Sequence, residues 1–245
     1  MRNSLRRYIS SAQFLSYTVT IASLTAFSAM LAPAQAASFS MDLQPFTGSP
    51  ASAKITLDDQ AAGTGKIRFR ADVGTGVIAD LRGLFFNVSD DSLLSGLQIG
   101  GLQYLDATNK TISVADKNIA YSFSANSVTS VCSKSNTMQG DGNSHVFDAG
   151  VEIGKEGIGQ GDDFRSAWFD LSLSDNFLKS QAGSKFQNGL QLSYFANQDF
   201  GVRLMSVGAD RSGSSKLAGT SPSLTPVVVT PPAPTPVVTP PAPAP

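Results

Sequence analysis

The chain has 245 residues, with 18 lysine and arginine against 19 aspartate and glutamate, and it contains one histidine, one cysteine and one tryptophan. A single cysteine excludes an intramolecular disulfide and a cysteine-rich zinc site, and a single histidine excludes a histidine-cluster zinc site. The slightly acidic balance argues against a nucleic-acid partner.

Residues 1–36 predict a cleavable export signal. Arg2, Arg6 and Arg7 precede an apolar run from Val19 to Leu31, and Ala34-Gln35-Ala36 supplies a small-x-small cleavage pattern. A retained anchor is the alternative, but polar residues interrupt the run and a membrane span needs about 20 apolar residues. The arginine pair leaves the twin-arginine route as a further alternative. Cleavage leaves 15 basic and 19 acidic side chains, and we expect a secreted chain with no stable membrane span.

Residues 37–221 predict one β domain, because their apolar residues recur with period two. Lys66 to Val73 alternates apolar and charged residues, which indicates a half-buried strand. Leu81 to Val88 is apolar on both faces, which is typical of a central strand. Six more segments alternate similarly: Ser38–Leu43, Ala53–Leu57, Ile119–Phe123, Ala167–Leu173, Leu190–Tyr194 and Val202–Leu204. The predicted fold class is an all-β antiparallel sandwich, jelly-roll-like, with no strand order derivable.

Helical signals are short. Asp90-Asp91-Ser92 is a capping pattern ahead of Leu93-Leu94, and Ser174-Asp175 can start a turn over Asn176 to Ser180. Neither segment is long enough to form a layer. Gly63-Thr64-Gly65-Lys66 lacks the remaining residues of a phosphate loop, so it predicts a turn that enters a strand.

Residues 222–245 form a proline-rich tail in which TPVVVTPPAP is followed by TPVVTPPAP. Proline lacks an amide donor and has a fixed φ, so polyproline II is the expected conformation. A passive spacer is the simplest interpretation. Penetration of a cell wall and docking to an aromatic groove are the functional alternatives.

The sequence contains no recognisable catalytic motif. His145 is the only histidine and no Gly-x-Ser-x-Gly motif occurs, so His145 is interpreted as a turn residue. Glu152 and Glu156 are the only glutamates. We expect them to be a solvated pair, although paired carboxylates are also what a glycosidase requires.

Aspartates in turns suggest calcium, which prefers oxygen ligands. The candidate ligands are Asp141, Asn143 and Asp148 in one segment, and Asp162 and Asp163 in a second. Neither segment matches an EF-hand loop. Because aspartate is also a common turn former, a purely local structural role is the alternative.

Trp168 lies on the polar side of the alternation in its predicted strand, which is unexpected for an aromatic residue. Residues 167, 169, 171 and 173 are the apolar set of its segment, which places Trp168 with Ser166, Asp170 and Ser172 on the other face. An outward-facing indole is a flat platform for a sugar ring or a partner protein. Alternatively, a loop or a bulge covers the side chain.

Three segments carry a family resemblance: Ile78–Gly101, Phe147–Asp163 and Phe200–Gly219. They resemble a group of uncharacterised cyanobacterial secreted proteins, many of which end in a PEP-CTERM sorting signal recognised by an exosortase. The resemblance implies an exported surface or matrix protein associated with exopolysaccharide, with no catalytic or binding residues to transfer. No Pro-Glu-Pro triplet, apolar helix or arginine cluster follows the tail, so we expect release or trapping through the tail rather than exosortase anchoring.

These observations leave three functional hypotheses. The first is a non-enzymatic extracellular module that binds polysaccharide or another surface or matrix component, with Trp168 as the candidate ligand-binding residue. The second is a secreted glycan hydrolase that uses carboxylates such as Asp162, Asp163 or Glu152. The third is a purely structural matrix protein.

Overall fold

The computed structural model describes residues 38–224, except 107, 133–135, 141 and 155–163. The predicted export signal and the tail from residue 225 onward lie outside the described residues. One layer of the fold uses β1 (Ser38–Gly48), β2 (Ala53–Asp58), β3 (Ile67–Val73), β5 (Leu97–Leu105), β6 (Thr111–Ser113) and β11 (Ser166–Leu173). The other layer uses β4 (Asp80–Phe86), β7 (Tyr121–Val128), β10 (Phe147–Glu152), β12 (Asp199–Val207) and β13 (Gly213–Thr220).

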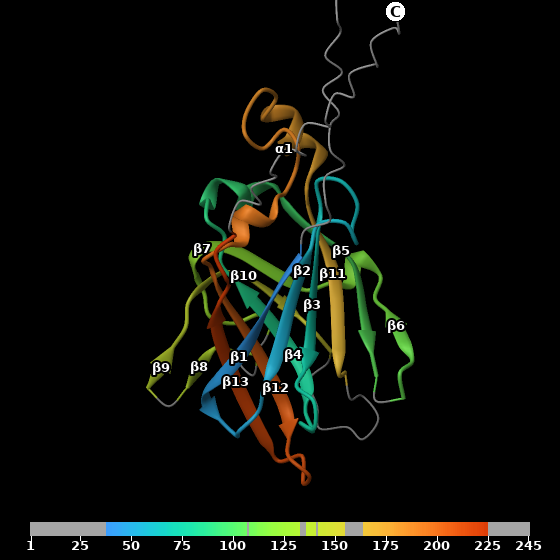
Figure 1. Cartoon of the computed structure of the whole chain (residues 1–245), viewed down its shortest axis with the longest axis vertical. Helices are drawn as coiled ribbons and strands as arrows, with labels where there is room; N and C mark the ends of the chain where they lie inside the picture. Colours follow the sequence, from blue (N-terminus) through green and yellow to red (C-terminus); the bar gives the residue numbers. More distant parts are fainter. Residues whose placement is uncertain (1–37, 107, 133–135, 141, 155–163, 225–245) are drawn as a thin grey trace, which may run out of the picture. The chain divides into compact units, whose positions relative to one another are not determined.

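These strands form an antiparallel sheet of order β6-β5-β11-β3-β2-β1-β13-β12-β4-β10-β7, and a separate hairpin pairs β8 (Gln139–Gly140) with β9 (Asn143–Ser144). The large sheet curls at β1, whose first half pairs with β2 and whose second half pairs with β13 (Figure 1). A register shift between Pro45 and Thr47 marks the bend, where proline supplies no amide to the ladder. The predicted all-β antiparallel sandwich is confirmed.

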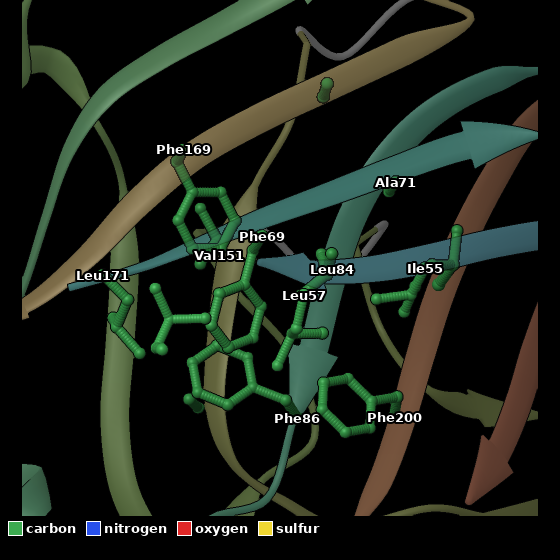
Figure 2. Close-up of a cluster of buried hydrophobic side chains, with 14 of the residues drawn as sticks. Ile55, Leu57, Phe69, Ala71, Leu84, Phe86, Val151, Phe169, Leu171 and Phe200 are labelled. Atoms are coloured by element: carbon green, nitrogen blue, oxygen red, sulfur yellow. The ribbon is translucent and has the colours of Figure 1, made fainter. Parts of the chain in front are cut away.

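The core lies between the two layers and is rich in phenylalanine. Phe69 of β3 lies 4.8 Å, centroid to centroid, from Phe86 of β4 and 5.3 Å from Phe169 of β11 (Figure 2). Phe195 and Phe200 also contact Phe69 through their rings. Phe69 and Phe169 come from the alternating apolar positions of β3 and β11, so the period-two pattern of these strands identifies the face that becomes the core.

A smaller apolar cluster covers the side of the β4–β12–β13 layer that points away from the main core. It contains Phe85, Val128, Val131, Met138 and Phe147, with Phe46 packed against it. Gly201 of β12 permits this close packing, because a Cβ atom there would lie 2.6 Å from the Met138 Cε atom. The segment that connects β7 to β10 thus lies directly on the sheet.

Most predicted strands occur close to their expected bounds. The segment from Leu81 is β4, which is buried on both faces and lies between β12 and β10, as expected for a central strand. The predicted strand at Ile119–Phe123 begins later, at Tyr121, and runs further as β7. No alternating pattern in the sequence predicted β5, β10 and β13.

The prediction of a strand over Leu190–Tyr194 was wrong. This segment leads into the 3-10 helix η3 (Leu192–Phe195), in which the Tyr194 amide donates to the Gln191 carbonyl at 3.1 Å. Leu190, Leu192 and Tyr194 are buried while Gln191 and Ser193 are exposed. The alternation therefore described burial correctly, but the backbone bonds locally instead of with a neighbouring strand.

Both short helical turns are confirmed. Asp90 caps the 3-10 helix η1 (Asp91–Gly96) by accepting from the Ser92 amide, and Ser174 caps α1 (Asp175–Ser180) by accepting from the Phe177 amide. A further 3-10 turn, η2 (Asp116–Asn118), follows β6. The segment from Gly63 to Lys66 is a turn that enters β3, as expected.

Candidate functional site

Trp168 lies on the outer, polar face of β11, as its strand parity predicts. Ala167, Phe169 and Leu171 on the opposite face are buried in the core, whereas Trp168 is half-buried. Its direct cross-strand neighbours are Arg70 on β3 and Gln103 on β5. We call the outward-facing surface of β5, β11, β3, β2 and β1 the outer face.

Arg70 holds one side of the indole. Its guanidinium carbon lies 5.6 Å from the Trp168 ring centroid, within cation–π range. The same guanidinium donates to both carboxylate oxygens of Asp72 at 2.8–3.0 Å and to the Ser166 hydroxyl at 3.2 Å. The Ser166 hydroxyl in turn donates to Asp72. This network fixes the orientation of Arg70 and so supports the exposed edge of the tryptophan.

A second arginine–aspartate pair lies two residues further along the same strands. Arg68 donates to Asp170 from Nε at 2.7 Å and from Nη2 at 2.9 Å. Hydrogen bonding to Asp170 raises the pKa of Arg68, and hydrogen bonding to Asp72 raises the pKa of Arg70. Both guanidiniums are therefore charged at every accessible pH, and their charge is neutralised within the face.

Side chains on the outer face form rows that cross the strands. One row is Gln103, Trp168, Arg70, Thr56 and Ser40, and the next is Ser166, Asp72, Lys54 and Asp42. Because neighbouring strands lie about 4.8 Å apart, the first row spans about 19 Å. It carries an aromatic ring next to one end, with amide, guanidinium and hydroxyl groups at its other positions.

An open groove of about 500 Å³ lies beside the second row, on β1, β2 and β3. Arg70 and Asp72 line it, together with Asp42, Gln44 and Lys54. Arg70 thus touches both the indole and the groove, so the platform and the groove form one continuous surface. An apolar ring beside fixed hydrogen-bonding groups can bind a molecule that has both an apolar face and hydroxyl groups.

The calcium candidates are only partly described. Asp148 is 2% exposed, and its two oxygens accept from the amides of Val88 at 2.9 Å and Asn126 at 2.7 Å. It therefore ties β10 to the ends of β4 and β7. Asp141, Asp162 and Asp163 and the side chain of Asn143 lie outside the described residues. Within the described ranges, no three histidine, cysteine, aspartate or glutamate side chains come close enough to hold a metal.

Glu152 differs from expectation, because it forms an ion pair with Arg82 at 2.6 Å and its side chain is only 19% exposed. The Arg82 side chain is 4% exposed and also donates to the Gly154 carbonyl. The interpretation of Glu152 as a solvated carboxylate was wrong, since residues distant in sequence enclose it. Glu156 lies outside the described residues.

Cys132 lies beside this ion pair. Partial burial of its sulfur and hydrogen bonding to Glu152 raise the pKa of the thiol, although the residue as a whole is exposed. Tyr104 is buried nearby, and burial raises its pKa as well. A raised thiol pKa reduces the thiolate fraction, so this cluster is poorly suited to nucleophilic catalysis. Sequence reasoning missed it because its members come from four separate segments.

His145 lies in the two-residue connection between β9 and β10. Its ring is half-buried and lies 4.3 Å from the Phe46 ring, centroid to centroid. The residue thus belongs to the aromatic cluster on the β12–β13 layer rather than to the outer face.

No family model, curated protein or solved structure gives a match to this chain. Among the described residues, no helix has the length and apolarity needed to cross a membrane.

Proposed function

We propose that this chain is an exported, non-enzymatic surface or matrix module that binds polysaccharide on its outer face. The observation that carries the proposal is the half-buried indole of Trp168, supported by Arg70 and followed by a row of polar side chains. Export rests on the N-terminal sequence pattern, and a secreted chain whose first residue is near Ala37 on N-terminal sequencing is the expected result.

The ligand that fits best is a neutral, extended glycan. A sugar ring can stack its C–H face on the indole while its hydroxyls bond to the neighbouring polar groups. Arg68 and Arg70 are each paired with an aspartate, so the face offers fixed donors and acceptors without a strong net charge. A row of about 19 Å suits several linked sugars better than one.

The pairing of carboxylates with arginines favours binding over hydrolysis. Glycoside hydrolysis needs a protonated carboxylic acid opposite a second carboxylate. Asp72 and Asp170 on the outer face are each held by an arginine, and Glu152 is paired with Arg82. The oxygens of these three carboxylates stabilise the fold or orient Arg70, so none of the three is free to act as the acid of a hydrolase.

The test uses Trp168 itself, since it is the only tryptophan in the chain and its fluorescence reports on this one site. Xylan or hydroxyethyl cellulose should change the emission in a saturable way with micromolar to millimolar affinity. Alginate, which is acidic, should bind more weakly. Sedimentation with insoluble cellulose gives a readout that is independent of fluorescence.

The matched variants are Trp168→Ala and Tyr121→Ala. Tyr121 is an exposed aromatic on β7, in the other layer. Trp168→Ala should abolish sedimentation, while Tyr121→Ala should retain it. Binding that survives Trp168→Ala would refute the site, and release of reducing ends from the glycan would support the hydrolase instead. Absence of binding to every glycan, together with self-assembly, would favour the structural matrix protein.

A further inference from the structure

A second concave surface lies on the β12–β13 layer. It has a volume of about 440 Å³, and its aromatic wall is made of Phe46 and His145. Pro45, Gln44, Asp199 and residues 218–220 complete its lining. We call it the Phe46 groove.

The wall of the Phe46 groove is held in place by the apolar cluster beneath it. The rings of Phe46 and His145 lie 4.3 Å apart at 48°, and the His145 ring lies 6.3 Å from Phe147, which is fully buried. Ala218 contributes only a methyl group, so that side of the groove stays open. At the rim, the Thr220 hydroxyl donates to Asp199 at 2.6 Å. The groove is thus a preformed aromatic slot.

The described chain ends four residues beyond Thr220 of the groove, where the Ser223 hydroxyl donates to the Asn197 side chain at 2.6 Å. Ser221 is buried and anchored, since its amide donates to Gln198 and its hydroxyl to Phe195. Leu224, the last described residue, is 38% exposed. Thr220 lines the groove, and the four residues from there to Leu224 span at most about 14 Å. Residues 225–232 alone would span about 25 Å as polyproline II, so the proline-rich segment can reach the groove.

We propose that the Phe46 groove binds the proline-rich segment 225–245 of the same chain. This segment has no charged side chain, and nine of its residues are proline. Polyproline segments dock in aromatic-lined grooves because their pyrrolidine rings pack on aromatic faces and little conformational entropy is lost.

The polar rim of the groove matches the backbone of such a segment. A polyproline chain presents carbonyl acceptors, and the groove offers the Gln44 amide and the His145 ring N–H as donors. Covalent attachment also raises the local concentration of the segment to the millimolar range, so even a weak contact is substantially populated. The tail is therefore a ligand of its own domain as well as a spacer.

The test uses His145, because the only imidazole in the chain gives one resolvable set of proton signals. In the full chain, the His145 ring protons should show nuclear Overhauser contacts to proline Cδ protons. Replacing Pro231, Pro232, Pro240 and Pro241 by alanine should remove these contacts and shift the ring signals. Both effects should be unchanged by a hundredfold dilution.

A groove variant and a control separate docking from a change in fold. Ala218→Arg should displace the tail and reproduce the ring shift, while Ala61→Arg, an exposed change in the β2–β3 turn, should not. Overhauser contacts that vanish on dilution would assign the occupant to another copy of the chain and overturn docking within the chain. His145 signals that do not respond to the tail replacements would overturn the proposal altogether. Neither result bears on glycan binding at Trp168.

Discussion

Trp168 and Arg70 are direct cross-strand neighbours on β11 and β3, with the guanidinium carbon 5.6 Å from the ring centroid. The pair lies on the face opposite the core, so its contribution to folding and its contribution to binding can be measured separately. A half-buried residue on a polar face contributes less to stability than a core residue.

We expect Trp168→Ala to lower the free energy of unfolding by about 1–2 kcal/mol, whereas Phe69→Ala in the core should cost about 3–5 kcal/mol. Combining Trp168→Ala with Arg70→Ala in a double-mutant cycle should give a coupling of about 0.5–1 kcal/mol, which is the range for a partly exposed cation–π pair. Urea unfolding of the four members of the cycle measures the coupling, and Phe69→Ala measured in the same way gives the core reference. A loss for Trp168→Ala as large as that for Phe69→Ala would mean that the indole belongs to the core.

The Arg82–Glu152 ion pair makes a second prediction. Glu152→Ala leaves the nearly buried guanidinium of Arg82 without its partner, so we expect a loss of about 3–5 kcal/mol in the free energy of unfolding. Arg82→Met combined with Glu152→Gln removes the charge from both sides and should recover part of this loss. Chemical denaturation of the single and double variants measures the difference. An unchanged stability of Glu152→Ala would mean that the ion pair does not stabilise the fold and that Glu152 is a free carboxylate.

Asp148 should act as a structural carboxylate, independent of calcium. Asp148→Ala leaves the amides of Val88 and Asn126 without their acceptor, and we expect a loss of about 3 kcal/mol. The loss should be the same in millimolar calcium and in chelator. Thermal melting of both proteins under both conditions tests this.

If calcium stabilises the unmodified chain, the linkage relation requires a rise in melting temperature with calcium concentration. A rise that Asp148→Ala abolishes would show that this carboxylate is a ligand, contrary to the expectation above. A rise that survives in Asp148→Ala but not in Asp162→Ala would locate the site in the second predicted segment.

Asp90 should make stability depend on pH in the acid range. Hydrogen bonds from Lys185 and Ser92 lower its pKa from 3.8 to about 2. Because the folded-state value is depressed, this contribution is fully present above the unfolded-state value and is lost as the pH falls from about 4 to about 2.

Asp90→Asn keeps the helix cap but removes the charge. It should therefore cost less than about 1 kcal/mol at pH 7, since ion pairs near the surface are screened by water. The difference from the unmodified protein should close at pH 2 and shrink in 1 M salt. Urea unfolding at pH 7, 4 and 2 measures this difference. Lys185→Gln should show a similar difference from the unmodified protein at pH 7, which also closes at pH 2. A gap that persists at pH 2 would point to the cap instead of the charge.

The period-two patterns determined which residues enter the core and which face outward. The alternation in residues 66–73 and 167–173 predicted β3, β11 and the outward parity of Trp168, because side-chain direction in a strand is a local property of the backbone. The Asp90 and Ser174 caps were also predictable, since each hydrogen bond closes within three residues.

Only the tertiary structure decided which strands pair and which side chains meet. The same alternation at Leu190–Tyr194 produced a 3-10 turn, because burial there is supplied by packing rather than by a neighbouring strand. Arg70 meets Trp168, Glu152 meets Arg82, and Asp148 meets the amides of Val88 and Asn126. Pairs of this kind join segments that are up to about a hundred residues apart, so they depend on the order in which the curled sheet assembles its strands, which no local pattern encodes.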